Sequence, residues 1–169
     1  SVYLHDTIVT VARSYVKIAL NDGTVLQLGP LSRCSLDKYS YDPSGKAGGT
    51  FEASVFTGFF RYISGKISGN TGEQHTVITT PSANIGIRGS EIDAQVDQNG
   101  STTVLHLAGL VSVSSRYRPG EEIVVYERGT TIYIPNDRAS ATTSTATENQ
   151  IQEKDQEWQI FNIVSPMGE

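Results

Sequence analysis

The chain has 169 residues, a length that fits one domain with an appendage and that can bury a core without disulfides or metal ions. Its net charge of −5 is uneven, because residues 1–136 carry 12 acids and 11 bases, whereas residues 137–169 carry 6 acids and 2 bases. A nearly neutral body and an acidic tail exclude the basic surface of a nucleic-acid-binding protein. No apolar run approaches the roughly 18 residues of a membrane span.

Charged residues make up only 18% of the chain, and Thr, Ser, Gly, Val and Ile are abundant, which favours strands and turns over helices. Over the first 135 residues, short strand patterns alternate with turn sequences about every 8–12 residues. This spacing predicts an all-β fold with many short strands. An antiparallel-rich β-roll or β-sandwich and a short β-solenoid both remain open, since no clean repeat period is visible.

The first predicted hairpin joins strands at Tyr15–Leu20 and Thr24–Leu28 through Asn21-Asp22-Gly23, a sequence that suits a tight turn. Residues 51–63 form an aromatic-rich strand that can be buried on both sides. Gly58 in its middle predicts a bulge or a close backbone approach. In strict alternation, one face of this strand would carry Val55, Thr57, Phe59, Arg61 and Ile63.

Further strands follow in chain order. Val77–Thr80 is a short strand that Pro81 ends, and Glu91–Val96 continues after it. Asp97-Gln98-Asn99-Gly100 then predicts another hairpin turn. The last strands, around Ile123/Val125 and Ile132/Ile134, are expected to pair with each other across Arg128-Gly129.

The end of the chain differs from the rest in composition. We divide the chain into an all-β domain over 1–136, a low-complexity Ser/Thr/Ala linker over 137–150, and a C-terminal apolar docking segment over 151–169. The candidate residues for docking or self-assembly are Trp158, Ile160, Phe161, Ile163 and Val164. Such a stretch is expected to pack on its own body or to add as a strand to another copy.

The segment Thr79–Ser90 is the most specific motif of the chain. It places Gly86 and Gly89 around Arg88, shortly after Pro81. We interpret these four residues as a structural motif in which the backbone turns sharply near one fixed positive charge.

Arg88 has two interpretations. It could recognise a carboxylate or phosphate of a partner, or it could hold the turns through backbone carbonyls or through an acid such as Asp37 or Asp42. We favour the structural role, because the flanking glycines suit a crowded backbone.

Five segments in a fixed order make the chain similar to a known family. They are Leu20–Pro30, Leu36–Pro43, Thr57–Ile67, Thr80–Ser90 and Thr102–Val113. Together they resemble the FecR protein domain family. The resemblance implies a non-enzymatic, all-β, extracytoplasmic domain, periplasmic or secreted and at the cell surface, that acts through protein–protein contact or as an envelope scaffold.

The best-known members of that family pass an outer-membrane siderophore-transport signal to a membrane-bound regulator of a sigma factor. This chain shows neither a transmembrane segment nor a cytoplasmic anti-sigma part. Family members also carry one or two strands before the segment that matches Asp6–Thr10, so an open sheet edge is expected here. The alternative function is therefore a self-assembling fibre or surface subunit, joined by exchange of terminal strands.

The sequence predicts no catalytic residues, no metal site and no cofactor. His5, His75 and His106 are far apart and lack partners at metal-ligand spacing, and Cys34 is expected to be a small buried apolar group. The expected partners are other proteins or further copies of the chain, not nucleic acid. A glycan-binding role is disfavoured, since the sequence supports it only by the aromatic residues Tyr39, Tyr41 and Tyr117.

Overall fold

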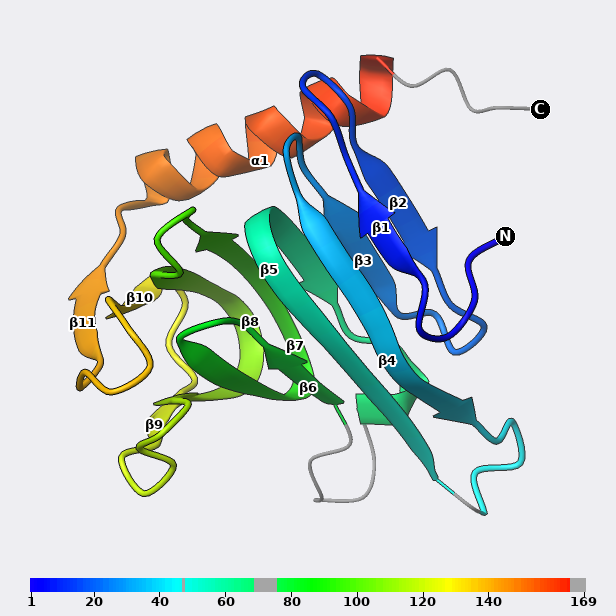
Figure 1. The fold of residues 1–169 in the computed structure, drawn as a ribbon, viewed down its shortest axis with the longest axis horizontal. Helices are drawn as coiled ribbons and strands as arrows, with labels where there is room; N and C mark the ends of the chain where they lie inside the picture. The colour runs from blue at the N-terminus through cyan, green and yellow to red at the C-terminus, as the bar shows by residue number, and fades with distance from the viewer. Residues whose placement is uncertain (47, 69–75, 165–169) are drawn as a thin grey trace.

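The computed structural model describes residues 1–46, 48–68 and 76–164, with side chains up to residue 160. In this part of the chain it contains strands and one α-helix, in agreement with the all-β prediction (Figure 1). The elements are β1 (Thr7–Val9), β2 (Val16–Ala19), β3 (Val25–Leu28), β4 (Arg33–Tyr41), β5 (Gly49–Ile63), the 3-10 turn η1 (Lys66–Ser68), β6 (Thr76–Thr79), β7 (Ala83–Val96), β8 (Thr102–Ser115), β9 (Ile123–Val125), β10 (Thr130–Ile134), β11 (Thr142–Thr145) and α1 (Glu148–Val164).

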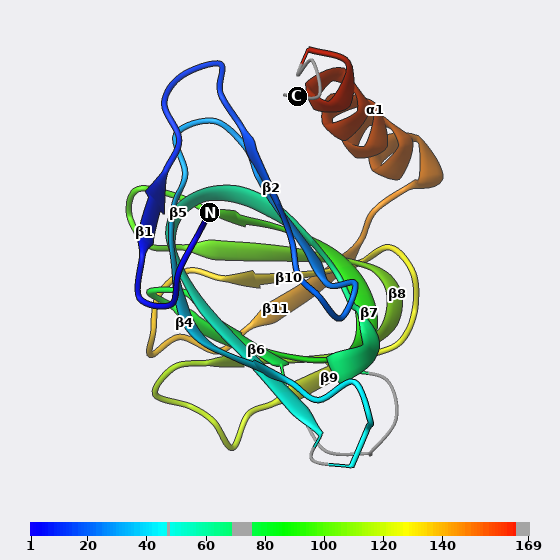
Figure 2. The same cartoon turned by 90° about the vertical axis from the view of Figure 1, so that its right-hand side faces the viewer.

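All these strands belong to one sheet with the central order β1-β4-β5-β6-β7-β8-β10-β11. The β2–β3 hairpin adds to β5, β9 adds to β8, and β5 also pairs directly with β7. The β5–β6 pair is parallel, and the other pairs are antiparallel. The sheet curls around its core into an open roll, and α1 lies outside it (Figure 2). Of the architectures that the sequence left open, the structure therefore has the antiparallel-rich roll.

The strands β5, β7 and β8 each change the face that they turn to the core, and each does so at a glycine. The backbone φ angle is 104° at Gly58, 57° at Gly89 and 79° at Gly109. These values lie in the left-handed region, which side chains other than glycine rarely adopt. At each glycine the strand contains one extra residue, a slip of one position. The side chains after it therefore point to the faces opposite to those that strict alternation predicts.

The slip in β5 decides which residues of this strand enter the core. Before Gly58 the residues that face the core are odd-numbered, and after it they are even-numbered, whereas the buried Arg61 lies on the opposite face. Val55 is completely buried on the core side, whereas Phe60 and Tyr62 take that side beyond the bulge. The prediction that Val55 and Arg61 share a face is therefore wrong. One extra residue at the bulge reverses the face to which each later side chain of β5 points.

The same slip occurs in β7 and β8, where two glycines meet. A Cβ atom on Gly109 would lie 2.0 Å from the carbonyl oxygen of Gly89, so only glycine fits there. The register between the strands shifts between Arg88 and Glu91. The Ser90 hydroxyl donates a hydrogen bond of 2.5 Å to the Leu110 carbonyl and secures this corner. The sheet can bend here without leaving a gap in its core.

The core consists of the inward-facing residues of the roll. Its large, completely buried members include Leu26, Leu28, Phe51, Phe60, Tyr62, Ile78, Ile85, Ile87, Ile92, Ile132 and Ile134. Cys34 is fully buried among them and is a free thiol, as expected. Burial, and secondarily the charge of Asp37, raises the pKa of the Cys34 thiol to about 12.

Three sequence-based expectations differ from the structure. The strands β9 and β10 do not pair with each other, because both lie along the same edge of β8. The Ser/Thr-rich segment expected to be a linker contributes β11, which pairs with β10. Of the two alternatives left open for the segment Trp158–Val164, addition as an extended strand differs from the structure, in which the segment is helical. The pairings of β9 with β8 and of β11 with β10 join strands that are adjacent in the chain, so the strand patterns alone did not indicate which neighbour each strand would pair with.

Substituting Gly109 by alanine should destabilise the protein by about 3 kcal/mol or more, because a Cβ would strain the positive φ and collide with the Gly89 carbonyl. Gly120→Ala is the matched control, since nothing lies within 4 Å of a Cβ built there. Its change should stay within about 0.5 kcal/mol. Urea unfolding of both variants measures the difference, and equal midpoints would contradict the assignment.

Alkaline pH should destabilise the protein through Cys34. The unfolded thiol loses its proton near its ordinary pKa of 9.0, whereas the folded thiol keeps it up to about 12. Stability is therefore lost as pH rises, by roughly 1 kcal/mol between about pH 8 and pH 10. Urea unfolding across this range, with Cys34→Ala for comparison, measures the effect. A variant as pH-sensitive as the original chain would refute it.

Candidate functional site

The helix α1 begins with a capping box. The Thr147 side-chain hydroxyl accepts a hydrogen bond from the Gln150 backbone N–H (3.2 Å), and the Gln150 side chain accepts one from the Thr147 N–H (2.9 Å). Only Ile151 and Trp158 are buried along the part of the helix with described side chains, and Lys154 and Asp155 are half-buried between them. Because these positions recur at helical spacing, α1 contacts the sheet along one stripe.

The surface below this stripe is the outer face of β3, β5, β7 and β8. On it, Arg61 of β5 stands directly opposite Asp93 of β7. Arg61 donates to both oxygens of the Asp93 carboxylate, from Nε at 2.6 Å and from Nη2 at 2.8 Å. Arg61 and Asp93 are 8% and 7% exposed, so this bidentate pair is almost fully removed from water.

Asp155 of α1 adds a third charge to this pair. Its Oδ1 atom lies 2.6 Å from Arg61 Nη2, and its side chain is 40% exposed. Burial alone would lower the pKa of Arg61, but the hydrogen bonds and charges of Asp93 and Asp155 raise it above its ordinary value. Burial raises the pKa of Asp93, against the opposing effect of Arg61. A cation shared by two carboxylates is thus the electrostatic link between helix and sheet.

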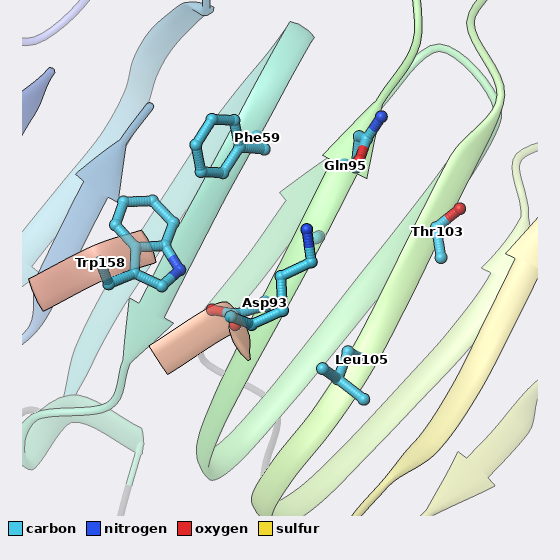
Figure 3. Close-up of a pocket in the computed structure, with 8 residues that line it drawn as sticks. Phe59, Asp93, Gln95, Thr103, Leu105 and Trp158 are labelled. Carbon is cyan, nitrogen blue, oxygen red and sulfur yellow. The ribbon is translucent and has the colours of Figure 1, made fainter. Parts of the chain in front are cut away.

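Trp158 supplies the apolar part of the same contact. Its ring centroid lies 5.0 Å from that of Phe59, and the Arg61 guanidinium carbon lies 5.7 Å from the indole centroid. A hydrogen bond from the Trp158 side chain to Asp93 also lowers the pKa of that carboxyl group. Figure 3 shows Trp158 reaching from α1 to a position between Phe59 and Asp93.

A second apolar contact anchors the start of the helix. Ile151 is completely buried and forms a small cluster with Leu105 and Leu107 of β8, separate from the main core. The stripe therefore has an aliphatic anchor, a carboxylate four positions later and an indole three positions after that.

The helix leaves cavities between itself and the sheet. One of about 70 Å³ lies beside Trp158 and Leu105 (Figure 3). A larger one of about 390 Å³ lies towards β2 and β3, lined by residues that include Lys17, Gln27 and Asp155. Another of about 360 Å³ reaches Leu31 at the opposite edge. The helix thus contacts the outer face of the sheet but leaves open space on both sides of the contact.

This arrangement suits recognition more than bond-making chemistry. The charged groups are one arginine and the two carboxylates paired with it, and the apolar groups around them resemble the anchors of a protein interface. Within the described ranges, no group of three or more His, Cys, Asp or Glu residues could hold a metal ion. His75 lies outside those ranges.

The structure places the four residues of the predicted motif along β6 and β7. Pro81 lies in the turn between these strands, which the Thr80 N–H closes by a 2.8 Å hydrogen bond to Ala83 O. Gly86 lies inside a regular part of β7, between β6 and β8. Gly89 is the bulge. Instead of two sharp turns, the segment therefore contains one turn and one bulge within a long strand.

Arg88 does not hold this corner as we expected. It is exposed and lines a surface cavity of about 140 Å³ with Glu122. The Asp37 carboxylate is bonded to Ser35 and Ser54 instead. The reason is positional, because Arg88 follows the buried Ile87 and alternation turns it outward.

The arginine with a fixed place is Arg61, which sequence reasoning did not select. A charged residue within an aromatic strand is a signal for a buried pair, but its partner Asp93 is 32 residues away. Only the β5–β7 register identifies that partner.

The predicted docking residues divide into two groups. Trp158 is 3% exposed and packs on its own chain, whereas Ile160 is 56% exposed. The side chains of Phe161, Ile163 and Val164 lie outside the described part of the structure.

Comparison with known proteins agrees with this fold. The FecR protein family matches residues 6–112, which is more than half of the chain, and the chain therefore belongs to this family. A search of curated protein sequences found no significant match.

Two solved structures are similar to this chain. Both are crystal structures of a "putative anti-sigma factor" from Parabacteroides distasonis ATCC 8503, each 14% identical in sequence, with TM-scores of 0.65 and 0.66. The matches cover 88% and 89% of this chain, but only 63% and 65% of the solved chains. At this identity the likeness establishes the fold. In the described residues, no helix is both long and apolar enough to cross a membrane.

The different roles of the two arginines predict different effects of substitution. Arg61→Ala should destabilise the protein by about 3–5 kcal/mol, because it leaves the buried Asp93 without its partner. Arg88→Ala, on the exposed side of the neighbouring strand, should change stability by less than about 0.5 kcal/mol. Thermal and urea unfolding measure both. A larger loss for Arg88 would restore its predicted structural role.

Proposed function

We propose that this chain is a non-enzymatic, extracytoplasmic regulatory domain that works by binding another protein. Membership of the FecR family supports both the compartment and the protein partner, since the resemblance described above is to periplasmic signalling domains. The likeness to a "putative anti-sigma factor" points in the same direction.

The observation that carries the proposal is an apolar patch beside the free edge of β1. Val9, Val11, Leu31 and Phe56 are exposed by 63%, 66%, 64% and 43%. They are neighbours, because the Leu31 N–H bonds to the Val11 carbonyl and Val9 stands opposite Arg33, whose guanidinium lies over the Phe56 ring. Exposed apolar groups that cluster in this way mark interaction surfaces.

Backbone strain distinguishes Leu31 from an ordinary surface residue. Its φ angle is 54°, in the left-handed region, and this conformation presents the side chain to solvent. A leucine held there has an energetic cost that neither burial nor packing repays, which is typical of functional positions. β1 ends the sheet, so an extended segment of a partner could pair with its edge while its side chains cover the patch.

Self-assembly through exchanged terminal strands is the weaker candidate. The segment that would be exchanged is helical, and Trp158 packs on Phe59 of its own chain. The patch could still bind a second copy, and the experiment separates this case by the mass of the product.

A photo-crosslinking residue in place of Phe56, introduced in the source cells, should yield a covalent adduct with one discrete protein of the envelope fraction. The same residue in place of Tyr126, which is 72% exposed on a different part of the roll, is the control and should not. An adduct of twice the chain's mass would indicate self-assembly, and equal adducts at both positions would refute the patch.

Leu31→Asn provides an independent test, because asparagine tolerates positive φ better than leucine and is polar. We expect the variant to be as stable as the original chain or up to about 1 kcal/mol more stable, and yet to lose the Phe56 adduct. Retention of the adduct with unchanged yield would show that Leu31 has no part in binding.

A further inference from the structure

We infer that the outer face beneath α1 is a second protein-binding surface, for an amphipathic helix of a partner, and that α1 is its occupant within the same chain. The helix required has an aliphatic residue, a carboxylate four positions later and an aromatic residue three positions after that. These are the places of Ile151, Asp155 and Trp158 in α1. This surface meets the patch around Leu31 at the cavity of about 360 Å³ that Leu31 lines together with Lys154 and Glu157 of α1. It takes a different ligand, a helix, and goes beyond the function proposed above.

The sheet builds this face without the help of the helix. The bidentate pair of Arg61 and Asp93 joins β5 to β7, and Phe59 and Leu105 lie beside it on the same face. The helix adds the Asp155 carboxylate, the side chains of Ile151 and Trp158, and an exposed ion pair of 3.3 Å between its first residue, Glu148, and Arg128. A preformed surface with a charged centre and apolar flanks has the arrangement of a recognition site.

The contact between α1 and the sheet consists of few side chains, so the helix can leave the face. Its two buried anchors are separated by a carboxylate that is 40% exposed, and cavities of about 390 and 360 Å³ border the contact. Because an ion pair of this exposure contributes little to stability, Ile151 and Trp158 supply most of the attachment. A competing helix therefore needs only a few side chains to replace the contacts that the face loses when α1 leaves it.

The chemistry of the face selects a helix over an extended peptide. The backbones of β5 and β7 are already paired on both sides at Arg61 and Asp93, so no strand can add there. A helix satisfies its own backbone and needs only side-chain contacts. Arg61 can donate a hydrogen bond to a carboxylate of that helix, as it does to Asp155, and Lys17 lines the cavity beside this position. Glu91 lines the same cavity, so the partner helix is expected to carry one carboxylate at the place of Asp155 and not an acidic stripe.

The test uses the full-length chain and a fluorescent synthetic peptide with the sequence of residues 147–164. In the unmodified chain the tethered helix competes with the peptide. An opened variant, Ile151→Ala with Trp158→Ala, should bind the peptide at least tenfold more tightly, because its face is free for a larger fraction of the time. Ile160→Ala, at an exposed position of the same helix, is the matched control and should bind like the unmodified chain.

Two further arms keep the result interpretable. Asp155→Lys in the full-length chain places two cations together and opens the helix without removing an apolar anchor, so it should also strengthen peptide binding. The same substitution in the peptide should abolish binding. The chain has a single tryptophan, so displacement by a Trp158→Phe peptide should shift the emission of the unmodified chain to longer wavelength.

The inference is overturned if folded opened variants do not bind the peptide, or if Ile160→Ala strengthens binding equally. Circular dichroism establishes that each variant is folded. It is also overturned if sedimentation shows the unmodified chain to be a dimer that exchanges α1 between copies, because the occupant is then a second copy.

Discussion

Three glycines with positive φ allow β5, β7 and β8 to change the face that each strand turns to the core. Gly58, Gly89 and Gly109 lie at the bends of the three longest strands. Without the slips, a strand of this length would present one set of residues inward along its whole course, and a curled sheet would expose part of its apolar surface. With them, both halves of each strand bury their large side chains, and the roll can bend around a continuous core.

The outer face depends on the same slips. The parity change at Gly58 turns Arg61 away from the core, and the change at Gly89 turns Asp93 to the same side. The antiparallel register then sets the two residues opposite each other, where they form a bidentate pair. A buried arginine and carboxylate are tolerable only together, and α1 completes their shielding from water. The helix contact is therefore a consequence of how the sheet bends.

Two surfaces of the molecule thus have different physical characters. The patch around Leu31 is apolar, open and next to an unpaired strand edge, whereas the face beneath α1 is charged at its centre and covered. A domain that transmits information by contact needs a surface that binds and a means of changing what is bound. FecR-family membership is compatible with such a role. The two surfaces adjoin at the cavity that Leu31 lines, but their central residues differ, so substitutions at Phe56 and at Trp158 test them one at a time.

The sequence by itself determined the all-β class and the β2–β3 hairpin, because each depends on residues close together in the chain, and it determined the family through five segments in a fixed order. At Gly58 it left a bulge and a close backbone approach open. Only the tertiary structure decided which arginine is buried, that β9 and β10 pair with β8, and that the apolar tail is a docked helix. Arg61 and Arg88 look alike in a local pattern. Their environments differ because a bulge reverses side-chain parity and because the partner of Arg61 comes from a distant strand, and both effects are set by register across the sheet.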